Sequence, residues 1–205
     1  MKRREAIRVM SLWSAGAIVA TELILTGCDD GPENTAANTE KKEDTGPKFE
    51  ERDLAMLNEI GETIIPKTDT PGAKAVGIGS FIAMMVRDCY EPDEQQVFMS
   101  GLQKIRDGFE EQHDKIFMLG TPEEKLAFLN GINEEMAEAA KKRKAMPGKN
   151  EEKPPIHYFK MMKELTVLGY FSSQVGATEA LRYIETPGRY DGCTDYEKGD
   201  RAWAV

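Results

Sequence analysis

Residues that carry redox, metal or nucleophilic chemistry are scarce in this sequence. Its 205 residues include two histidines and three cysteines. His113 and His157 lie far apart, without cysteine or acidic residues at metal-ligand spacing around them, which favours a surface or helix-capping role over metal binding. A glycine-rich dinucleotide fingerprint, a phosphate loop and a Cys-x-x-Cys-His haem motif are all missing. We therefore predict no catalytic residue, cofactor or metal in this chain.

Positive charge is also in short supply. The 27 lysines and arginines are outnumbered by 36 aspartates and glutamates, so the net charge is −9. An acidic chain does not suit the phosphate backbone of nucleic acids, and we predict no nucleic-acid partner. The one basic run, Lys141-Lys142-Arg143-Lys144, stands shortly before Pro147 and is typical of a solvated helix end.

The N-terminus has the pattern of a bacterial lipoprotein signal. Arg3 and Arg4 precede an apolar stretch over residues 9–27. That stretch ends in Leu25-Thr26-Gly27-Cys28, which has the form of a lipobox. In this interpretation residues 1–27 are removed as a signal peptide and Cys28 carries the lipid. The alternative is a short N-terminal helix that happens to contain a cysteine.

The arginine pair also indicates an export route. The run from Lys2 to Arg8 resembles a twin-arginine signal, which serves cargo exported in the folded state. Ala6 departs from the aromatic or large apolar residue usual at that place, whereas Ile7 fits. Glu22 indicates a weakly hydrophobic signal. An ordinary secretion signal with two chance arginines is the alternative. We expect an exported protein, lipid-anchored to a bacterial membrane on its periplasmic side.

Removing the signal leaves 178 residues, enough for one domain. It also removes four basic and two acidic residues, which leaves 23 against 34 and a net charge of −11. Residues 28–48 contain no large apolar side chain, so we interpret them as a flexible lipoprotein tether, in which Asp29-Asp30 is either a sorting signal or simply polar spacer. No segment after residue 27 is long and apolar enough to span a bilayer, so membrane attachment would rest on the lipid.

Apolar residues recur at helical spacing from Phe49 onward. The expected helices run from Phe49 to Ile64, Ile78 to Cys89, Pro92 to Phe109, Thr121 to Met136 and Phe159 to Leu168, with a shorter one over Ala177–Ile184. Their apolar faces include Cys89, Leu126 and Leu168. No alternating strand pattern of useful length occurs. Residues 49–205 are therefore predicted to form an all-α, single-domain helical bundle.

The segment from Tyr183 onward differs in kind. Proline, glycine and aromatic residues occur there without periodicity, through Cys193 to Trp203. We predict an ordered, irregular C-terminal tail, because its aromatic side chains have apolar surface to bury. The tail could pack on its own bundle, pinned by Cys193, or on a partner.

Two cysteines remain once Cys28 is assigned to lipid. Cys89 and Cys193 form an even pair in an exported protein, which favours a disulfide. A bridge over so long a loop contributes up to about 4–5 kcal/mol in the chain-entropy model. The alternative is two buried free thiols.

Two segments carry a resemblance to a known family. The first is Ile64-Ile65-Pro66-Lys67-Thr68-Asp69-Thr70-Pro71-Gly72-Ala73, followed by Phe81-Ile82 and Asp88-Cys89-Tyr90. The second is the stretch from Gly169 to Tyr183, followed by Pro187-Gly188-Arg189-Tyr190-Asp191-Gly192-Cys193. Together they resemble gluconate 2-dehydrogenase subunit 3, the small gamma subunit of membrane-associated flavin dehydrogenases. The resemblance covers roughly residues 50–205.

This resemblance implies an accessory role without catalysis. Its large partner would be an FAD-containing subunit of the glucose-methanol-choline type that oxidises a sugar or sugar acid, often accompanied by a cytochrome c subunit. The family's small subunit commonly carries the twin-arginine signal for both chains, which fits Arg3 and Arg4. The lipobox departs from the simplest family pattern and suggests that this chain also anchors the complex. The residues expected at the partner interface are Tyr170, Phe171, Tyr183, Arg189, Tyr190 and Trp203.

Two other functions remain open on the sequence. One is a stand-alone lipoprotein, a sugar-binding or scaffold module without a flavoprotein partner. The other is a catalytic subunit in its own right. Oxidation of sugars by the purified chain alone would favour the enzyme, and a neighbouring reading frame with a flavin-binding glycine motif would favour the accessory subunit.

Overall fold

A computed structural model describes residues 46–148, 153–186, 188–189 and 192–204. Arg3, Arg4, Cys28 and Tyr190 lie outside the described residues, as does nearly all of the predicted tether. The export signal and the lipid site therefore stay predictions.

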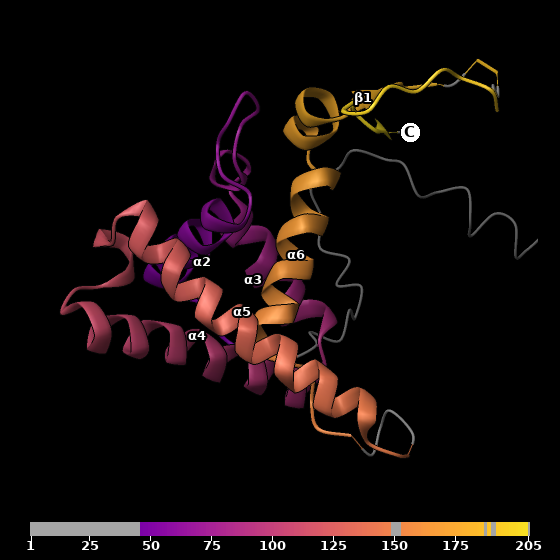
Figure 1. Ribbon diagram of the computed structural model, residues 1–205. Helices are drawn as coiled ribbons and strands as arrows, with labels where there is room; N and C mark the ends of the chain where they lie inside the picture. The colour runs from indigo at the N-terminus through magenta and orange to yellow at the C-terminus, as the bar shows by residue number, and fades with distance from the viewer. Residues whose placement is uncertain (1–45, 149–152, 187, 190–191, 205) are drawn as a thin grey trace, which may run out of the picture. The chain divides into compact units, whose positions relative to one another are not determined.

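The described residues are mostly helical, which confirms the predicted all-α fold (Figure 1). The described part of the chain contains five α-helices: α2 (Glu51–Ile64), α3 (Ile78–Cys89), α4 (Pro92–His113), α5 (Pro122–Ala145) and α6 (Tyr158–Ser172). The shorter elements are the 3-10 turns η1 (Ala73–Val76) and η2 (Phe117–Leu119), the π-helical turn η4 (Gly176–Ala180) and two strands, β1 (Arg182–Tyr183) and β2 (Trp203–Ala204).

Local sequence signals set the helix starts. At α5 the Thr121 hydroxyl accepts the Glu124 N–H at 3.3 Å, and the Glu124 carboxylate accepts the Thr121 N–H at 2.8 Å. This reciprocal capping box satisfies two backbone donors that the first turn leaves unpaired. At α6 the cap is His157, whose Nδ1 accepts the Phe159 N–H at 3.2 Å. Of the two roles expected for the histidines, at the surface or at a helix cap, His157 has the cap role.

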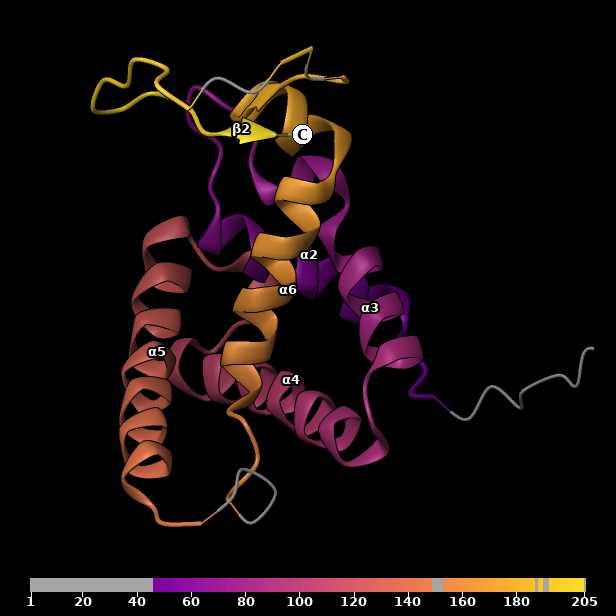
Figure 2. The same ribbon diagram turned by 90° about the vertical axis from the view of Figure 1, so that its right-hand side faces the viewer.

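Helix α6 occupies the centre of the domain, because it contacts α2, α3, α4 and α5. One continuous core lies between these helices, and its largest fully buried side chains are Tyr170, Phe98, Phe109, Phe117, Met56 and Met162. Figures 1 and 2 show α4 crossing near one end of α6, while η4 and the two strands lie beyond its other end. Tyr158 packs directly over Gly101 of α4, since a Cβ there would lie 2.1 Å from the Tyr158 ring.

Three details of the predicted packing are corrected. Cys89, Leu126 and Leu168 are exposed, not buried. Helix α3 buries Ile78, Ile82 and Val86. Cys89 lies on a neighbouring side of the helix, at the edge of the core. The helix expected over Ala177–Ile184 forms only in its first half, as the π-helical turn η4, and β1 follows it. The N–H groups of Arg182 and Ile184 donate to the carbonyls of Ala202 and Ala204, so pairing with a distant segment overrides the local preference for a helix.

The predicted disulfide is not formed. Cys89 and Cys193 are both exposed, and no bond joins them. Cys89 ends α3 just before α4 begins, whereas Cys193 belongs to the tail beyond the opposite end of α6 (Figures 1 and 2). Nearly every described tail residue between β1 and β2 is exposed, so the tail does not pack on the bundle in the way that would bring the thiols together.

Candidate partner-binding surface

The solvent-facing side of α6 changes from charged to apolar along the helix. In its first half Lys160 and Glu164 form an exposed ion pair at 3.2 Å. In its second half Val167, Leu168 and Phe171 are each between 40% and 52% exposed. Val167 and Leu168 lie four and three residues before Phe171, so each is a neighbour of Phe171 on the helix surface. Their side chains therefore form a continuous apolar stripe that the core does not use.

The other side of these turns of α6 packs closely against the rest of the domain. Tyr170 is only 1% exposed, and its hydroxyl donates a hydrogen bond of 2.5 Å to the Pro71 carbonyl. At Gly169 an added Cβ would lie 2.4 Å from the Phe81 ring and 2.6 Å from Ile78. Close packing of this kind fixes how far α6 is rotated and therefore which side chains face solvent.

Tyr170 must accordingly be reassigned. We expected its side chain at a partner interface, next to that of Phe171. Successive side chains of an α-helix point about 100° apart around the helix axis, and the planes of these two rings meet at 80°. Tyr170 belongs to the core, and Phe171 is the exposed member of the pair.

Beyond η4 the chain ends in a small parallel ladder. Arg182 pairs with Trp203, and Tyr183 with Ala204. The Arg182 N–H donates to the Ala202 carbonyl at 2.8 Å, and the Ile184 N–H donates to the Ala204 carbonyl at 3.0 Å. These bonds attach the end of the tail to the segment that follows α6.

Arg182 is the centre of this attachment, and sequence reasoning missed it. Its Nε donates to the Arg201 carbonyl at 2.7 Å, and its guanidinium lies 3.3 Å from the Asp200 carboxylate. The guanidinium also lies 4.7 Å from the Trp203 ring centroid, in cation–π geometry. No local pattern could have found this role, because all of its partners are about twenty residues away.

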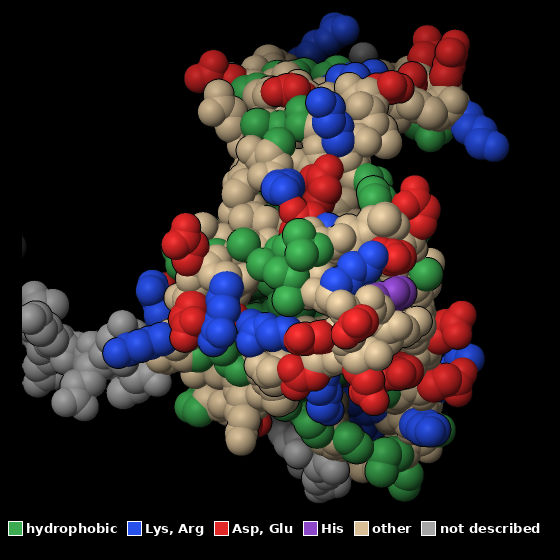
Figure 3. All heavy atoms as spheres, turned by 90° about the vertical axis from the view of Figure 1, so that its left-hand side faces the viewer, with side chains coloured by type: hydrophobic (Ala, Val, Ile, Leu, Met, Phe, Trp, Pro, Cys, Tyr) green, Lys and Arg blue, Asp and Glu red, His purple; other side chains and the backbone are tan. Residues whose placement is uncertain are grey.

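Tyr183 and Trp203 are about half exposed, like the stripe on α6. We give the name α6-end surface to the exposed apolar side chains at this end of the domain, which are Val167, Leu168, Phe171, Tyr183 and Trp203. Tyr183 and Trp203 lie on opposite faces of the ladder, because Trp203 pairs with Arg182 and Tyr183 with Ala204. In Figure 2, η4 and β2 lie just beyond the C-terminal end of α6. Arg189 is exposed in the tail nearby in sequence. On the face that Figure 3 shows, charged side chains of both signs surround a hydrophobic group.

The two histidines have structural surroundings. Burial lowers the pKa of His157, which favours the neutral imidazole that caps α6. The His113 ring packs on Phe109 at 4.4 Å, and its Nδ1 lies 4.0 Å from Glu124. Within the described ranges, no three histidine, cysteine or acidic side chains are grouped so that they could hold a metal ion.

None of the described helices has the length and apolar character needed to cross a membrane.

A comparison with protein families identifies the chain. The family model of gluconate 2-dehydrogenase subunit 3 matches residues 51–188, which is more than half of the sequence. The chain belongs to this family. The match spans all five helices, η4 and β1, and so includes the α6 stripe and Tyr183. Searches of curated proteins and of solved structures found no match. Membership supports an accessory role beside other gluconate dehydrogenase subunits.

Proposed function

We propose that this chain is the non-catalytic small subunit of an FAD-dependent sugar or sugar-acid dehydrogenase, and that the α6-end surface binds the large flavoprotein subunit. The observation that carries the proposal is the run of exposed apolar side chains on α6, within the segment that matches the family. Adjacent exposed apolar side chains of this size are typical of protein interfaces.

The composition of the surface suits a protein partner. It combines two aliphatic side chains with Phe171, Tyr183 and Trp203, and aromatic residues are enriched at interface centres. A standard interface buries roughly 800 Å² on each partner, more than five side chains supply. The exposed tail between β1 and β2 would contribute the rest, held in place by Arg182.

The partner carries the redox chemistry in this proposal. FAD belongs to a large subunit of the glucose-methanol-choline type, and a cytochrome c subunit can accept its electrons. Flavin loading before export requires a route for folded cargo, which the pair Arg3-Arg4 supplies for both chains. Lipid on Cys28 then holds the complex at the periplasmic side of a bacterial membrane.

The test is co-purification from the native host with tagged full-length protein. The surface variant Leu168→Ser/Phe171→Ser removes two exposed side chains without opening the core. The control Met84→Ser/Leu119→Ser removes two apolar side chains that are also exposed but lie on α3 and η2. Flavin absorbance per small subunit measures the bound partner.

We expect the surface variant to lose most of its flavin and the control to retain it. Central interface side chains contribute about 2 kcal/mol each, equivalent to roughly a thirtyfold weaker association. Equal flavin recovery with both variants would reject the α6-end surface. A colourless wild-type protein without any large partner would reject the accessory role itself.

A further inference from the structure

A cleft of about 190 Å³ lies where the end of α2 meets α5 and the first half of α6. Leu129 and Phe159 line it and are buried, so they form an apolar floor. Leu126 also lines it and is about half exposed, which places an apolar side chain at the rim. None of the lining residues adjoins an undescribed segment, since residues 153–158 separate even Phe159 from the nearest one.

Lys163 of α6 is the only charged residue among the described ones that line this cleft. Its ammonium donates a hydrogen bond of 2.8 Å to the Asn133 amide oxygen of α5. That bond holds the half-buried side chain across the space between the two helices, so the positive charge has a fixed place. It uses one of the three donors of the ammonium group and leaves two for another acceptor.

The surroundings of Lys163 differ from those of other cations in the domain. Four other basic side chains that are at least partly buried each have a carboxylate partner. The pairs are Arg106 with Asp53, Lys115 with Glu124, Lys125 with Glu59 and Arg182 with Asp200. Among the described residues no acid forms an ion pair with Lys163, and the neighbouring Glu164 pairs with Lys160 instead. Partial burial weakens the hydration of a cation, so an added carboxylate would stabilise this one.

The cleft also borders the α6-end surface. Val167 belongs to that surface and follows Lys163 by four residues, so the two side chains are neighbours on α6. Their Cβ atoms are about 5–6 Å apart at this spacing. A partner that covers Val167 therefore comes within one helical turn of the Lys163 side chain.

We propose that this cleft receives an aspartate or glutamate side chain of the large flavoprotein subunit, and that this acid pairs with Lys163. The inference rests on the proposed function and names one contact of that interface. The ammonium would donate to the carboxylate, and the apolar floor would pack against the methylene groups that carry it. Because Asn133 already holds Lys163, little side-chain freedom is lost when the pair forms.

Carbodiimide cross-linking of the complex purified from the native host tests this contact directly. The reagent joins an amine to a carboxylate without a spacer, so it reports pairs that already touch, and mass spectrometry locates the link. We expect Lys163 to be joined to an acidic residue of the flavin-containing subunit. A link from Lys163 to an acid of its own chain or of a second copy would overturn the proposal. An unmodified Lys163 in a complex that cross-links elsewhere would overturn it as well.

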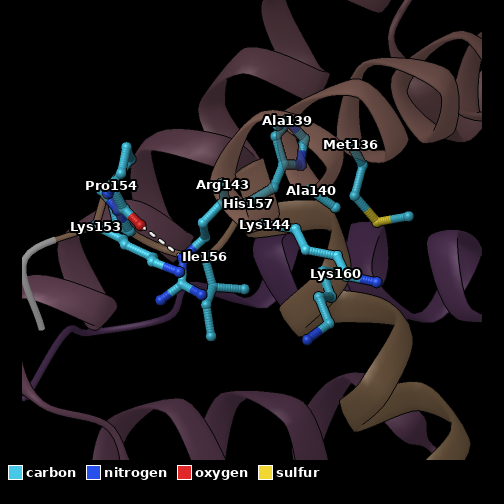
Figure 4. Close-up of a pocket in the computed structure, with 11 residues that line it drawn as sticks. Met136, Ala139, Ala140, Arg143, Lys144, Lys153, Pro154, Ile156, His157 and Lys160 are labelled. Atoms are coloured by element: carbon cyan, nitrogen blue, oxygen red, sulfur yellow. Dashed lines mark hydrogen bonds between the residues drawn. The ribbon is translucent and has the colours of Figure 1, made fainter. Parts of the chain in front are cut away.

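Substitution then measures what the contact contributes to the complex. Lys163→Gln removes the charge from the cleft. Lys160→Gln is the matched control, because it removes an equal charge one turn earlier on α6. The Lys160 side chain is exposed and lines a separate cavity together with Arg143 (Figure 4). Flavin released over time from the immobilised complex gives the dissociation rate of the large subunit.

We expect release about tenfold faster than wild type with Lys163→Gln and less than twofold faster with Lys160→Gln. Equal release from wild type and Lys163→Gln would overturn the contact and leave the α6-end surface in place. A wild-type protein that retains no flavin-containing chain would overturn both the accessory role and this contact. If Lys163→Gln fails to fold, the cross-link in the wild-type complex decides alone.

Discussion

Glu59 joins three separate elements through one carboxylate. It lies on α2, and its Oε2 accepts a hydrogen bond of 2.7 Å from the Lys125 ammonium of α5. Its other oxygen accepts from Lys74 of η1. The Lys125 side chain is only 9% exposed and that of Glu59 is 18% exposed. Replacing Glu59 by Gln would leave the Lys125 charge largely buried without its counter-ion.

The cost of Glu59→Gln can be worked from these contacts. Removing one partner of a fully buried pair costs about 3–5 kcal/mol. Lys125 keeps a 3.5 Å contact with the Met118 carbonyl and lies 5.6 Å from the Phe117 ring centroid, which offsets part of the loss. The exposed arm to Lys74 contributes at most about 1 kcal/mol. We therefore expect about 2–3 kcal/mol of destabilisation, which lowers the melting temperature by about 5–10 °C.

The effect should depend on pH with a defined sign. Burial raises the pKa of the Glu59 carboxyl, but the hydrogen bonds from Lys125 and Lys74 outweigh it, so the pKa lies below its usual value of 4.5. A lowered folded-state pKa gives stability that is complete above the unfolded-state pKa and is lost as pH falls through the folded one. The difference between wild type and Glu59→Gln should thus be full at pH 7 and shrink below about pH 4.5.

Thermal unfolding followed by circular dichroism, from pH 7 down to pH 3, checks both statements. Glu164→Gln is the matched control, because it removes an exposed pair on α6 and should cost less than about 0.5 kcal/mol. Equal melting temperatures for the two variants at pH 7 would refute the reasoning. A Glu59→Gln deficit that grows towards acid pH would refute the assigned sign.

Three further substitutions test the buried side of α6 and the attachment of the tail. Tyr170→Phe leaves the Pro71 carbonyl without its donor and should cost about 1–2 kcal/mol in denaturant unfolding; an unchanged midpoint would contradict the buried bond. Gly169→Ala should cost about 1–3 kcal/mol through overpacking against Phe81, and a stabilised variant would show that the helices can separate there. Arg182→Ala should speed amide hydrogen exchange at Ile184 while the melting temperature changes little, and unchanged exchange would mean that the ladder holds without the side chain.

Much of the helical framework could be predicted from local signals. Pro66 stops α2, and Thr121 with Pro122 starts α5, because capping and proline geometry act within one turn of helix. The core positions Phe98, Leu102, Ile105 and Phe109 were correct as well, since α4 buries one regular face. The family resemblance also rested on sequence alone.

The candidate sites could not be predicted in the same way. Tyr170 and Phe171 are adjacent aromatic residues, and only the packing of Gly169 against α3 decides which one faces solvent. The sequence predicted that Arg182 belongs to a short helix, whereas in the structure it lies in β1 and pairs with Trp203 of β2.

The sequence by itself determined the helical class, the starts of the five described α-helices and the family, because periodicity, caps and motifs depend on neighbouring residues. Tertiary structure alone decided that Cys89 and Cys193 are not bridged and that α6 leaves an apolar stripe exposed. The physical reason is that these arrangements depend on the rotation of each helix about its axis and on contacts between distant segments, which close packing of the whole core fixes.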